Sequence, residues 1–249
     1  MALKTTSGAD ILFGGDVHGC FDHLAPLVRA HAPKALVLLG DIEADRPLAE
    51  IAAPWEALGC AVWFIPGNHD SDSLERWQAL AECPERNLDG RVVEIAGVRI
   101  AGLGGVFRET IWDGAQAPRY VHYEDYAAQL ARRVGGAAWL SVSDRGRSLR
   151  HRTSIFPGVH DRLVAEQADI LVTHEAPSCH PHGFAAIDEL ARCLGVRRLF
   201  HGHHHDNRDY GPGNELGFTV HGVGLRGVSD GNGRVLRAGE RDRERSGRL

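Results

Sequence analysis

Lysine is nearly absent from this chain of 249 residues, which contains only Lys4 and Lys34. The formal net charge is -5 and the sequence pI is about 6.3, so the sequence provides no broad basic surface. Tight nonspecific binding to duplex nucleic acid needs such a surface, and long duplexes are therefore disfavoured as partners. Any phosphate clamp built from side chains must use arginine, whose planar guanidinium matches phosphate oxygens.

Paired cysteines and long apolar segments are also lacking. The five cysteines are an odd number and form no C-x-x-C pair: Cys20, Cys60, Cys83, Cys179 and Cys193. The first residues do not show the basic region and apolar core of a signal peptide, and no apolar run is long enough to span a membrane. We therefore expect a reduced, cytoplasmic setting in which the cysteines serve as small apolar residues.

The remaining composition is that of a globular protein. The chain is 43% hydrophobic and 24% charged. We expect one domain over residues 1–236, with an insertion at about residues 107–154 that covers the site or forms a cap. The segment 237–249 is charged and lacks an apolar period, which predicts a disordered tail.

Five short blocks rich in Asp, His and Asn are the most informative feature present. They are Gly15-Asp16-Val17-His18-Gly19, Gly40-Asp41, Gly67-Asn68-His69-Asp70, Thr173-His174-Glu175 and Gly202-His203-His204-His205. Each block follows an apolar run that is typical of a buried strand. Oxygen ligands and imidazoles delivered from several strand ends are what a two-metal hydrolytic centre requires.

The first three blocks occur in a repeated strand, loop and helix pattern. Apolar runs at residues 10–13, 35–39 and 61–65 precede them, and helices are expected from Asp22 and over residues 47–58, where Pro54 could bend the helix. This alternation favours an α/β fold with parallel strands, in which ligands bind beyond the carboxyl ends of the strands.

Other elements are predicted from local pattern. They are a hairpin over residues 91–103 that turns at Ala96-Gly97, helices over residues 123–133 and 185–194, strands over residues 169–172 and 197–200, and a closing hairpin within residues 215–228.

Residue spacing indicates how the blocks could hold metals. Asp16 and His18 are two apart, so in an extended chain both side chains lie on one face. His203 and His205 have the same spacing, which would turn His204 away. Asp41 is a lone carboxylate, and a carboxylate can bridge two cations. These mixed nitrogen and oxygen ligands suit manganese, iron or zinc.

Two metals about 3.5–4 Å apart can clamp a phosphoryl group and acidify a water, so that the hydroxide attacks phosphorus in line. The leaving oxygen then needs a proton. His69 follows a candidate ligand and is free to supply it.

The five blocks, in this order from Asp16 to His205, resemble the motifs of the calcineurin-like metallophosphoesterase superfamily: D-x-H, G-D, G-N-H-D/E, H and G-H-x-H. The resemblance implies a four-layer α/β/β/α sandwich with two mixed sheets. It also implies two divalent metal ions, with manganese favoured, and His69 at the leaving-group side. One metal would bind Asp16, His18, Asp41 and His205, and the other would bind Asp41, Asn68, His174 and His203.

The second block departs from the G-D-x-V-D-R-G motif of the protein-phosphatase branch of this superfamily. The spacing between Asp41 and Asp45 is one residue longer, and Pro47 follows Arg46. It is therefore open whether Arg46 binds phosphate and whether Asp45 orients His69. Arg108 is a second candidate for a phosphate contact.

The preferred hypothesis is a hydrolase of phosphomonoesters, with a phosphoprotein or a nucleotide as substrate. A phosphodiesterase or nuclease acting on cyclic nucleotides or short nucleic acid is the alternative enzyme. The alternative class is a catalytically silent, metal-containing binding module. The intact ligand set and His69 favour an enzyme.

Overall fold

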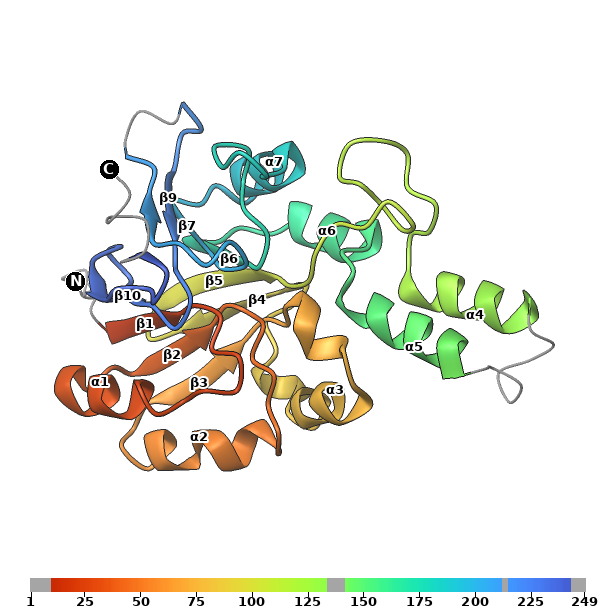
Figure 1. The fold of residues 1–249 in the computed structure, drawn as a ribbon. Helices are drawn as coiled ribbons and strands as arrows, with labels where there is room; N and C mark the ends of the chain where they lie inside the picture. The colour runs from red at the N-terminus through yellow and green to blue at the C-terminus, as the bar shows by residue number, and fades with distance from the viewer. Residues whose placement is uncertain (1–9, 134–141, 212–214, 243–249) are drawn as a thin grey trace.

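Two mixed β-sheets form the centre of the molecule (Figure 1). The computed structural model describes residues 10–133, 142–211 and 215–242. The first sheet has the order β11-β10-β1-β2-β3, with β1 (Ile11–Gly14), β2 (Ala35–Leu38), β3 (Ala61–Phe64), β10 (Val228–Asp230) and β11 (Val235–Arg237). The second has the order β4-β5-β6-β7-β9-β8, with β4 (Arg91–Ile95), β5 (Val98–Leu103), β6 (Ile170–Thr173), β7 (Arg198–His201), β8 (Arg208–Asp209) and β9 (Thr219–Gly222).

Parallel strands occupy the middle of both sheets. β1, β2 and β3 are parallel to one another, and so are β5, β6, β7 and β9. Antiparallel strands β10, β4 and β8 pair at the sides. Because the parallel strands of one sheet run the same way, their carboxyl ends lie along one edge, which is where ligands bind in α/β folds.

Helices cover the two outer faces (Figure 1). The helices are α1 (Leu24–His31), α2 (Leu48–Glu56), α3 (Leu74–Ala81), α4 (Tyr123–Arg133), α5 (Val142–Arg150), α6 (Pro157–Val164) and α7 (Ala185–Leu194), with short 3-10 turns η2 (Asn68–Ser71), η3 (Pro84–Arg86) and η5 (His151–Thr153). α1, α2 and α3 lie beneath the first sheet, whereas α6 and α7 lie on the second. The expected four-layer α/β/β/α sandwich is confirmed.

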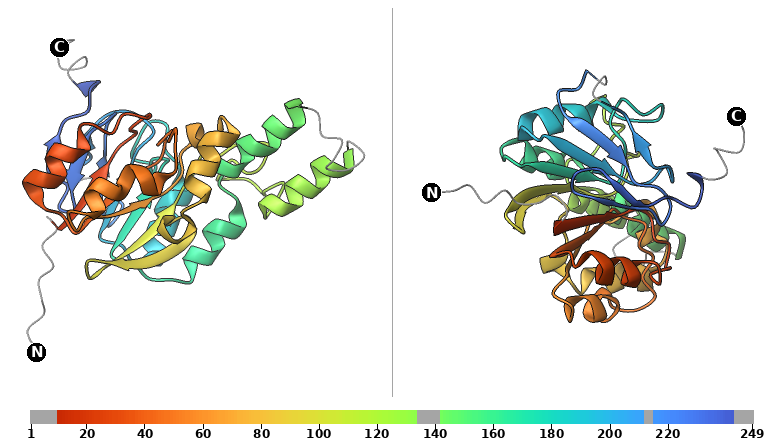
Figure 2. Two further views of the ribbon diagram at one scale, coloured as in Figure 1. Left: turned by 90° about the horizontal axis from the view of Figure 1, so that it is seen from below. Right: turned by 90° about the vertical axis from the view of Figure 1, so that its left-hand side faces the viewer.

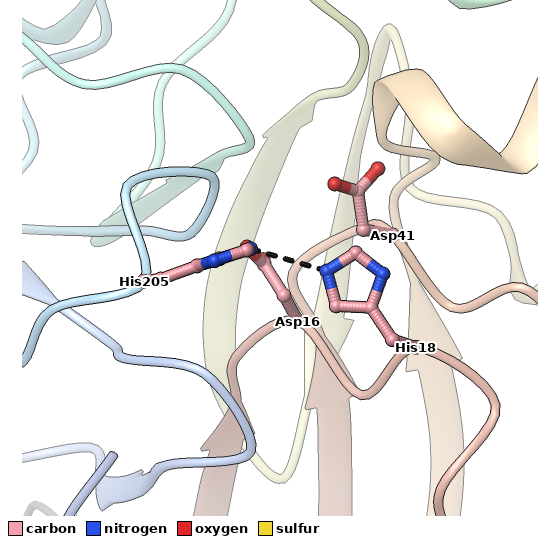
Figure 3. A group of neighbouring side chains, drawn as sticks. All are labelled: Asp16, His18, Asp41 and His205. Atoms are coloured by element: carbon pink, nitrogen blue, oxygen red, sulfur yellow. Dashed lines mark hydrogen bonds and ion pairs between the residues drawn. The ribbon is translucent and has the colours of Figure 1, made fainter. Parts of the chain in front are cut away.

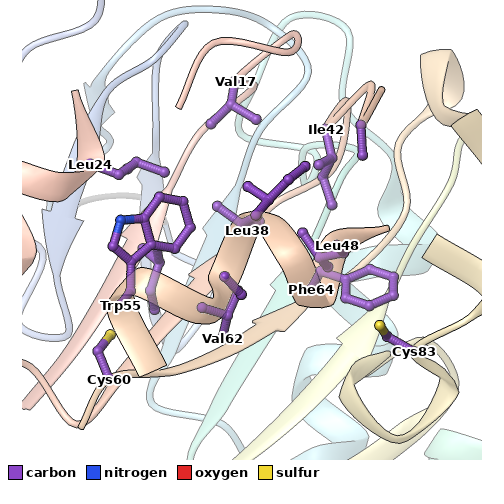
Figure 4. Close-up of a cluster of buried hydrophobic side chains, with 14 of the residues drawn as sticks. Val17, Leu24, Leu38, Ile42, Leu48, Trp55, Cys60, Val62, Phe64 and Cys83 are labelled. Atoms are coloured by element: carbon purple, nitrogen blue, oxygen red, sulfur yellow. The ribbon is translucent and has the colours of Figure 1, made fainter. Parts of the chain in front are cut away.

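Three apolar clusters fill the three interfaces between these layers. Side chains alternate along β1, so Leu12 packs towards the helices while Ile11 and Phe13 face the other sheet. The Phe13 ring stacks on Phe200 of β7, with centroids 4.0 Å apart. Figure 4 shows the cluster between the first sheet and its helices, where Trp55 of α2 packs near Leu24 of α1. This packing holds the strand ends in fixed positions.

Most of the expected elements are present, with one exception. α2 continues through Pro54, the helices at residues 123–133 and 185–194 have the expected bounds, and β4 and β5 form the expected hairpin around Ala96. The closing hairpin within residues 215–228 is wrong. β9 pairs with β7 in the second sheet, whereas β10 pairs with β1 in the first, so this segment crosses between the sheets.

The segment expected as an insertion projects from the body. α4 and α5 lie side by side and extend away from the sheets, as Figures 1 and 2 show. A small apolar cluster of Ile111, Tyr126 and Phe156 packs at the base of this projection. Trp112 and Tyr123 pack against the cluster.

The segment that was expected to be a disordered tail begins with ordered residues. Arg237 lies in β11, and Asp242 accepts a hydrogen bond from the Asn207 side chain at 2.6 Å. Residues 243–249 lie outside the described residues. Among the described helices, none combines the length and apolar character that crossing a bilayer requires.

Candidate metal centre

The five sequence blocks meet where the parallel strands of the two sheets end. Asp16, Asp41 and Asn68 follow β1, β2 and β3 of the first sheet. His174 follows β6, and His203 follows β7 of the second sheet. The site is therefore assembled from both sheets, as the strand-end argument predicts.

One group of side chains gathers Asp16, His18, Asp41 and His205, with one ligand atom from each within 4.8 Å of the others (Figure 3). Nε2 of His18 lies 3.1 Å from Nε2 of His205. The same His205 nitrogen lies 3.0 Å from Oδ2 of Asp16, yet that oxygen accepts no hydrogen bond. A buried carboxylate oxygen without a hydrogen bond, facing two imidazole nitrogens, is arranged to share a cation with them.

A second group gathers Asp41, His174 and His203. Nε2 of His174 lies 3.5 Å from Oδ2 of Asp41 and 3.2 Å from Oδ1 of Asn68. Asp41 is the only residue shared by the two groups found among the described residues. It therefore occupies the position of a bridging carboxylate.

The two carboxylates at the centre are deeply buried. Asp16 is 0% exposed and Asp41 is 1% exposed, and among the described residues their ion pairs involve imidazoles only. Burial acts to lower the pKa of His174, but the Asp41 and Asp16 carboxylates and a backbone carbonyl outweigh it and raise the pKa to about 10. Burial acts to raise the pKa of Asp41, but His174 and the His69 amide hold it well below its usual range. The two buried carboxylates therefore favour the binding of positive charge at this site.

Neighbouring oxygens orient two of the imidazoles. Nδ1 of His174 donates to the carbonyl oxygen of Leu39 at 2.7 Å, which leaves Nε2 facing the group. Nδ1 of His18 is hydrogen-bonded to Glu43, whose other oxygen pairs with Arg76 at 2.6 Å. Such contacts fix the tautomer and the ring orientation of metal-binding histidines. Glu43 and Leu39 were not identified from the sequence, although Glu43 lies only two residues beyond Asp41.

The loops that carry these side chains adopt left-handed backbone conformations. φ is +43° at His18, +47° at Asp41, +67° at His203 and +61° at His205. Non-glycine residues rarely adopt this region, and such strain concentrates at functional sites. The expectation of an extended chain is therefore wrong. His203 and His205 do not share one face but belong to different groups.

Two glycines allow the loops to approach one another. A side-chain carbon at Gly67 would overlap the Asp41 amide and carboxylate, and one at Gly202 would overlap the Asp16 carboxylate. Neither glycine has a positive φ, so the requirement is for space. Backbone amides complete the packing, because His69 N donates to Asp41 at 2.8 Å and His203 N donates to Asp16 at 3.1 Å.

His69 stands at the solvent side of the centre. Its side chain is 46% exposed, and its ring centroid lies 5.6 Å from that of His18. Nδ1 pairs with Oδ2 of Asp72 at 2.6 Å. Burial acts to lower the pKa of His69, but the Asp72 hydrogen bond and the Asp41 carboxylate outweigh it and raise the pKa. Sequence reasoning missed Asp72; its position three residues after His69 was the available signal.

The remaining sequence candidates, Asp45, Arg46 and Arg108, and the neighbouring Asp70 differ in their surroundings. Asp45 and Arg46 pair with each other at 3.3 Å and are both exposed, and the carboxylate that orients His69 is Asp72 rather than Asp45. Asp70 is buried and accepts hydrogen bonds from the Gly67 and Glu43 amides at 2.7 Å each. Arg108 is half-buried and packs against the segment after α5.

The donor set fits two divalent cations. The two groups offer four imidazoles and two buried carboxylates, with the Asn68 amide oxygen beside the second group. This mixture of nitrogen and oxygen ligands suits manganese, iron or zinc. The two groups contain six of the seven expected ligand residues, and the seventh, Asn68, lies within hydrogen-bond distance of His174.

Comparison with known proteins agrees with this geometry. Residues 9–207 match the model of the calcineurin-like phosphoesterase family. The chain is 40% identical over 242 residues to an uncharacterized protein of Haemophilus influenzae, covering 94% of this chain and all of that protein. A crystal structure from Thermus thermophilus is similar with TM-score 0.52 and 14% identity, covering 92% of this chain and 97% of the other. The structure of a dimetal phosphatase from Danio rerio is similar with TM-score 0.54 and 16% identity, covering 89% of this chain and 92% of the other. At these identities the two structures show a shared fold.

Proposed function

We propose a substrate class and a mechanism for this chain, which belongs to the calcineurin-like phosphoesterase family. Family membership implies a metal-dependent hydrolase of phosphoesters. We propose that the substrates are phosphomonoesters, such as a phosphoprotein or a nucleotide, and that the metals are two ions of manganese, iron or zinc, with manganese favoured.

The observation that carries this proposal is the convergence of two ligand groups on one shared carboxylate, Asp41. In the proposed assignment, Asp16, His18, Asp41 and His205 hold one metal, and Asp41, Asn68, His174 and His203 hold the other. Bound metals would acidify a water molecule and neutralise charge on the phosphoryl oxygens. The protein orients the imidazoles through Glu43 and the Leu39 carbonyl, and it keeps Asp41 ionised.

His69 supports the leaving-group step. Because Nδ1 is hydrogen-bonded to Asp72, Nε2 is the nitrogen available to substrate. Despite burial, the Asp72 hydrogen bond and the Asp41 carboxylate raise the pKa of His69, which favours the protonated imidazole. We therefore assign His69 the transfer of a proton to the departing oxygen, which is a general-acid role.

The cysteines support a reducing environment for this activity. All five are free. Among them, Cys60 and Cys83 are buried within the apolar cluster under the first sheet (Figure 4). The expected cytoplasmic setting is consistent with unpaired thiols.

A paired steady-state assay tests the proposed function. Metal-stripped protein is reloaded with manganese and assayed with p-nitrophenyl phosphate and bis-p-nitrophenyl phosphate. Faster turnover of the monoester supports a phosphatase. Faster turnover of the diester would replace the proposal with a phosphodiesterase, and metal binding without cleavage of either ester would favour a silent binding module.

A further inference from the structure

Arg108 is an arginine held in place from one side. Its Nη1 donates to the carbonyl oxygens of Arg150 and Thr153 at 3.1 and 2.8 Å, and to Oγ of Ser154 at 2.9 Å. The three acceptors lie at the end of α5, in the turn η5 and directly after that turn. The other guanidinium nitrogens, Nε and Nη2, have no acceptor among the described residues. The guanidinium is therefore fixed while part of it is left available.

The anchor of Arg108 is shared with the turn that carries His69. The Arg150 carbonyl oxygen that accepts from Arg108 also accepts from Oγ of Ser71 at 3.2 Å. Ser71 additionally pairs with Oγ1 of Thr153 at 2.6 Å. Ser71 is the last residue of η2, two residues after His69. One carbonyl oxygen thus joins Arg108 to the solvent side of the metal centre.

Arg108 lacks an anionic partner in the protein. Among the described residues, no carboxylate oxygen lies within the 4.0 Å range of an ion pair with its guanidinium. Burial and the neighbouring Arg150 lower the pKa of Arg108 to about 10. The carboxylates of Glu175, Asp72 and Asp41 act in the opposite direction and raise this pKa, although none of them contacts the guanidinium. A half-buried cation without a contacting anion is an unfavourable arrangement that a bound anion would relieve.

We propose that Arg108 binds a nonbridging oxygen of the phosphoryl group of the substrate, and that it favours phosphomonoesters over diesters. This inference rests on the proposed function, since it places the phosphoryl group at the same centre. A monoester has three nonbridging oxygens and a diester has two. If the metals engage two oxygens, only a monoester keeps a third for the guanidinium, which binds such oxygens through its free donors.

The competing explanation is a purely structural role, in which Arg108 fastens the α4–α5 projection to the body. That role uses Nη1 and needs no ligand. Arg108→Lys separates the two explanations, because an ammonium keeps a charge and can bond the same carbonyl oxygens but has no planar fork. Arg46→Met is the matched control, since Arg46 is an exposed arginine that pairs with Asp45.

The experiment measures binding of inorganic phosphate to the manganese-loaded, full-length protein by isothermal titration calorimetry, with metal content determined separately. We expect Arg108→Met to raise the dissociation constant about tenfold or more, as for loss of a charge-assisted hydrogen bond. Arg46→Met should change it less than about twofold. Arg108→Lys should keep the wild-type melting temperature and metal content but remain weakened in phosphate binding.

Three results would overturn the inference: phosphate binding by Arg108→Met with wild-type affinity, full recovery of affinity by Arg108→Lys, or no phosphate binding by the wild type. The ratio of monoester to diester kcat/KM adds a second readout, and it should fall in Arg108→Met. An unchanged ratio contradicts the proposed preference.

Failure of the proposed function gives a different pattern. If the wild type cleaves neither ester but binds phosphate through Arg108, the anion site stands and the hydrolase proposal fails. If the wild type cleaves the monoester and Arg108→Met binds phosphate normally, the hydrolase proposal stands and the role of Arg108 fails.

Discussion

His69 and Asp72 form an ion pair, with Nδ1 and Oδ2 2.6 Å apart, beside the candidate metal centre. The pair fixes the imidazole so that Nε2 is the nitrogen presented to substrate. Asp72 also lies 4.0 Å from Arg76, which contacts Glu43, the partner of His18. His69 and the candidate metal ligand His18 are thus held by a single connected set of charged side chains.

The first prediction concerns Asp72. We expect Asp72→Asn to retain both metals but to lower kcat about tenfold for an ester with a poor leaving group, because His69 loses its orienting carboxylate. Phenyl phosphate should be affected more than p-nitrophenyl phosphate. Asp45→Asn is the control and should leave both rates unchanged. If Asp72→Asn slows turnover as much in a His69→Ala background as in the wild type, Asp72 does not act through His69.

The second prediction concerns Glu43. Replacing it with Gln removes the carboxylate that orients His18, so we expect metal affinity to fall about 10- to 100-fold, as for other partners of metal-binding histidines. Metal titration of the stripped protein measures this. Glu50→Gln, on the exposed side of α2, provides the control. Equal metal affinities for Glu43→Gln and the wild type would show that Glu43 does not support metal binding through His18.

The third prediction separates the two metals. Asp41 belongs to both ligand groups, whereas Asp16 belongs to one. Asp41→Asn should therefore lower the occupancy of both metals together with activity, and Asp16→Asn should lower the occupancy of one more than the other. Mass spectrometry of the loaded protein counts the ions. Full occupancy and full activity in Asp41→Asn would exclude a bridging role.

The fourth prediction uses the left-handed backbone at His203. Both His203→Ala and His203→Gly remove the imidazole, but only glycine adopts a φ of +67° without strain. In metal-free protein we expect the glycine variant to be more stable than the alanine variant by about 1 kcal/mol. Urea unfolding of the two variants gives the difference. A more stable alanine variant would show that the metal-free loop relaxes to another conformation.

The fifth prediction concerns acid stability and His151, which is buried against Tyr126 at the base of the projection. Burial, with Arg108 and Arg150, lowers the pKa of His151 to about 4. The unfolded chain binds this proton more readily, so the stabilisation is complete above about pH 6.5 and is lost as the pH falls towards 4.

His151→Gln should therefore flatten the dependence of the unfolding free energy on pH between about 6.5 and 4, by up to about 1 kcal/mol per pH unit. Denaturant titrations of metal-free protein at several pH values measure the slope. His31→Gln, an exposed histidine on α1, should leave the slope close to wild type. An unchanged slope in His151→Gln would show that this imidazole titrates alike in both states.

The sequence predicts the strand ends and fails at the loops beyond them. Apolar runs ending in glycine and a polar residue located β1, β2 and β3, because buried parallel strands have that pattern. The same pattern carries no information about the left-handed turns at His203 and His205. The alternation expected along an extended strand therefore predicted the wrong relative positions for these two side chains.

Helix α5 was missed for a different reason. It has Gly146 in its middle and is mostly polar, so it lacks the apolar period on which a prediction depends. α4, only one segment earlier, has a Tyr and Leu face and was predicted with the observed bounds. The partner of His69 was also missed, because choosing between Asp45 and Asp72 requires knowing how the chain turns after β3.

The order of the ligands along the chain has a consequence for biosynthesis. Asp16 and His205 lie side by side, yet they come from the first and the last of the five sequence blocks. During translation, the ligands that follow β1, β2 and β3 are synthesised early, and His203 and His205 are synthesised late. Neither ligand set can be complete until the loop after β7 has been translated, so metals would be selected only after both sheets have supplied their ligands.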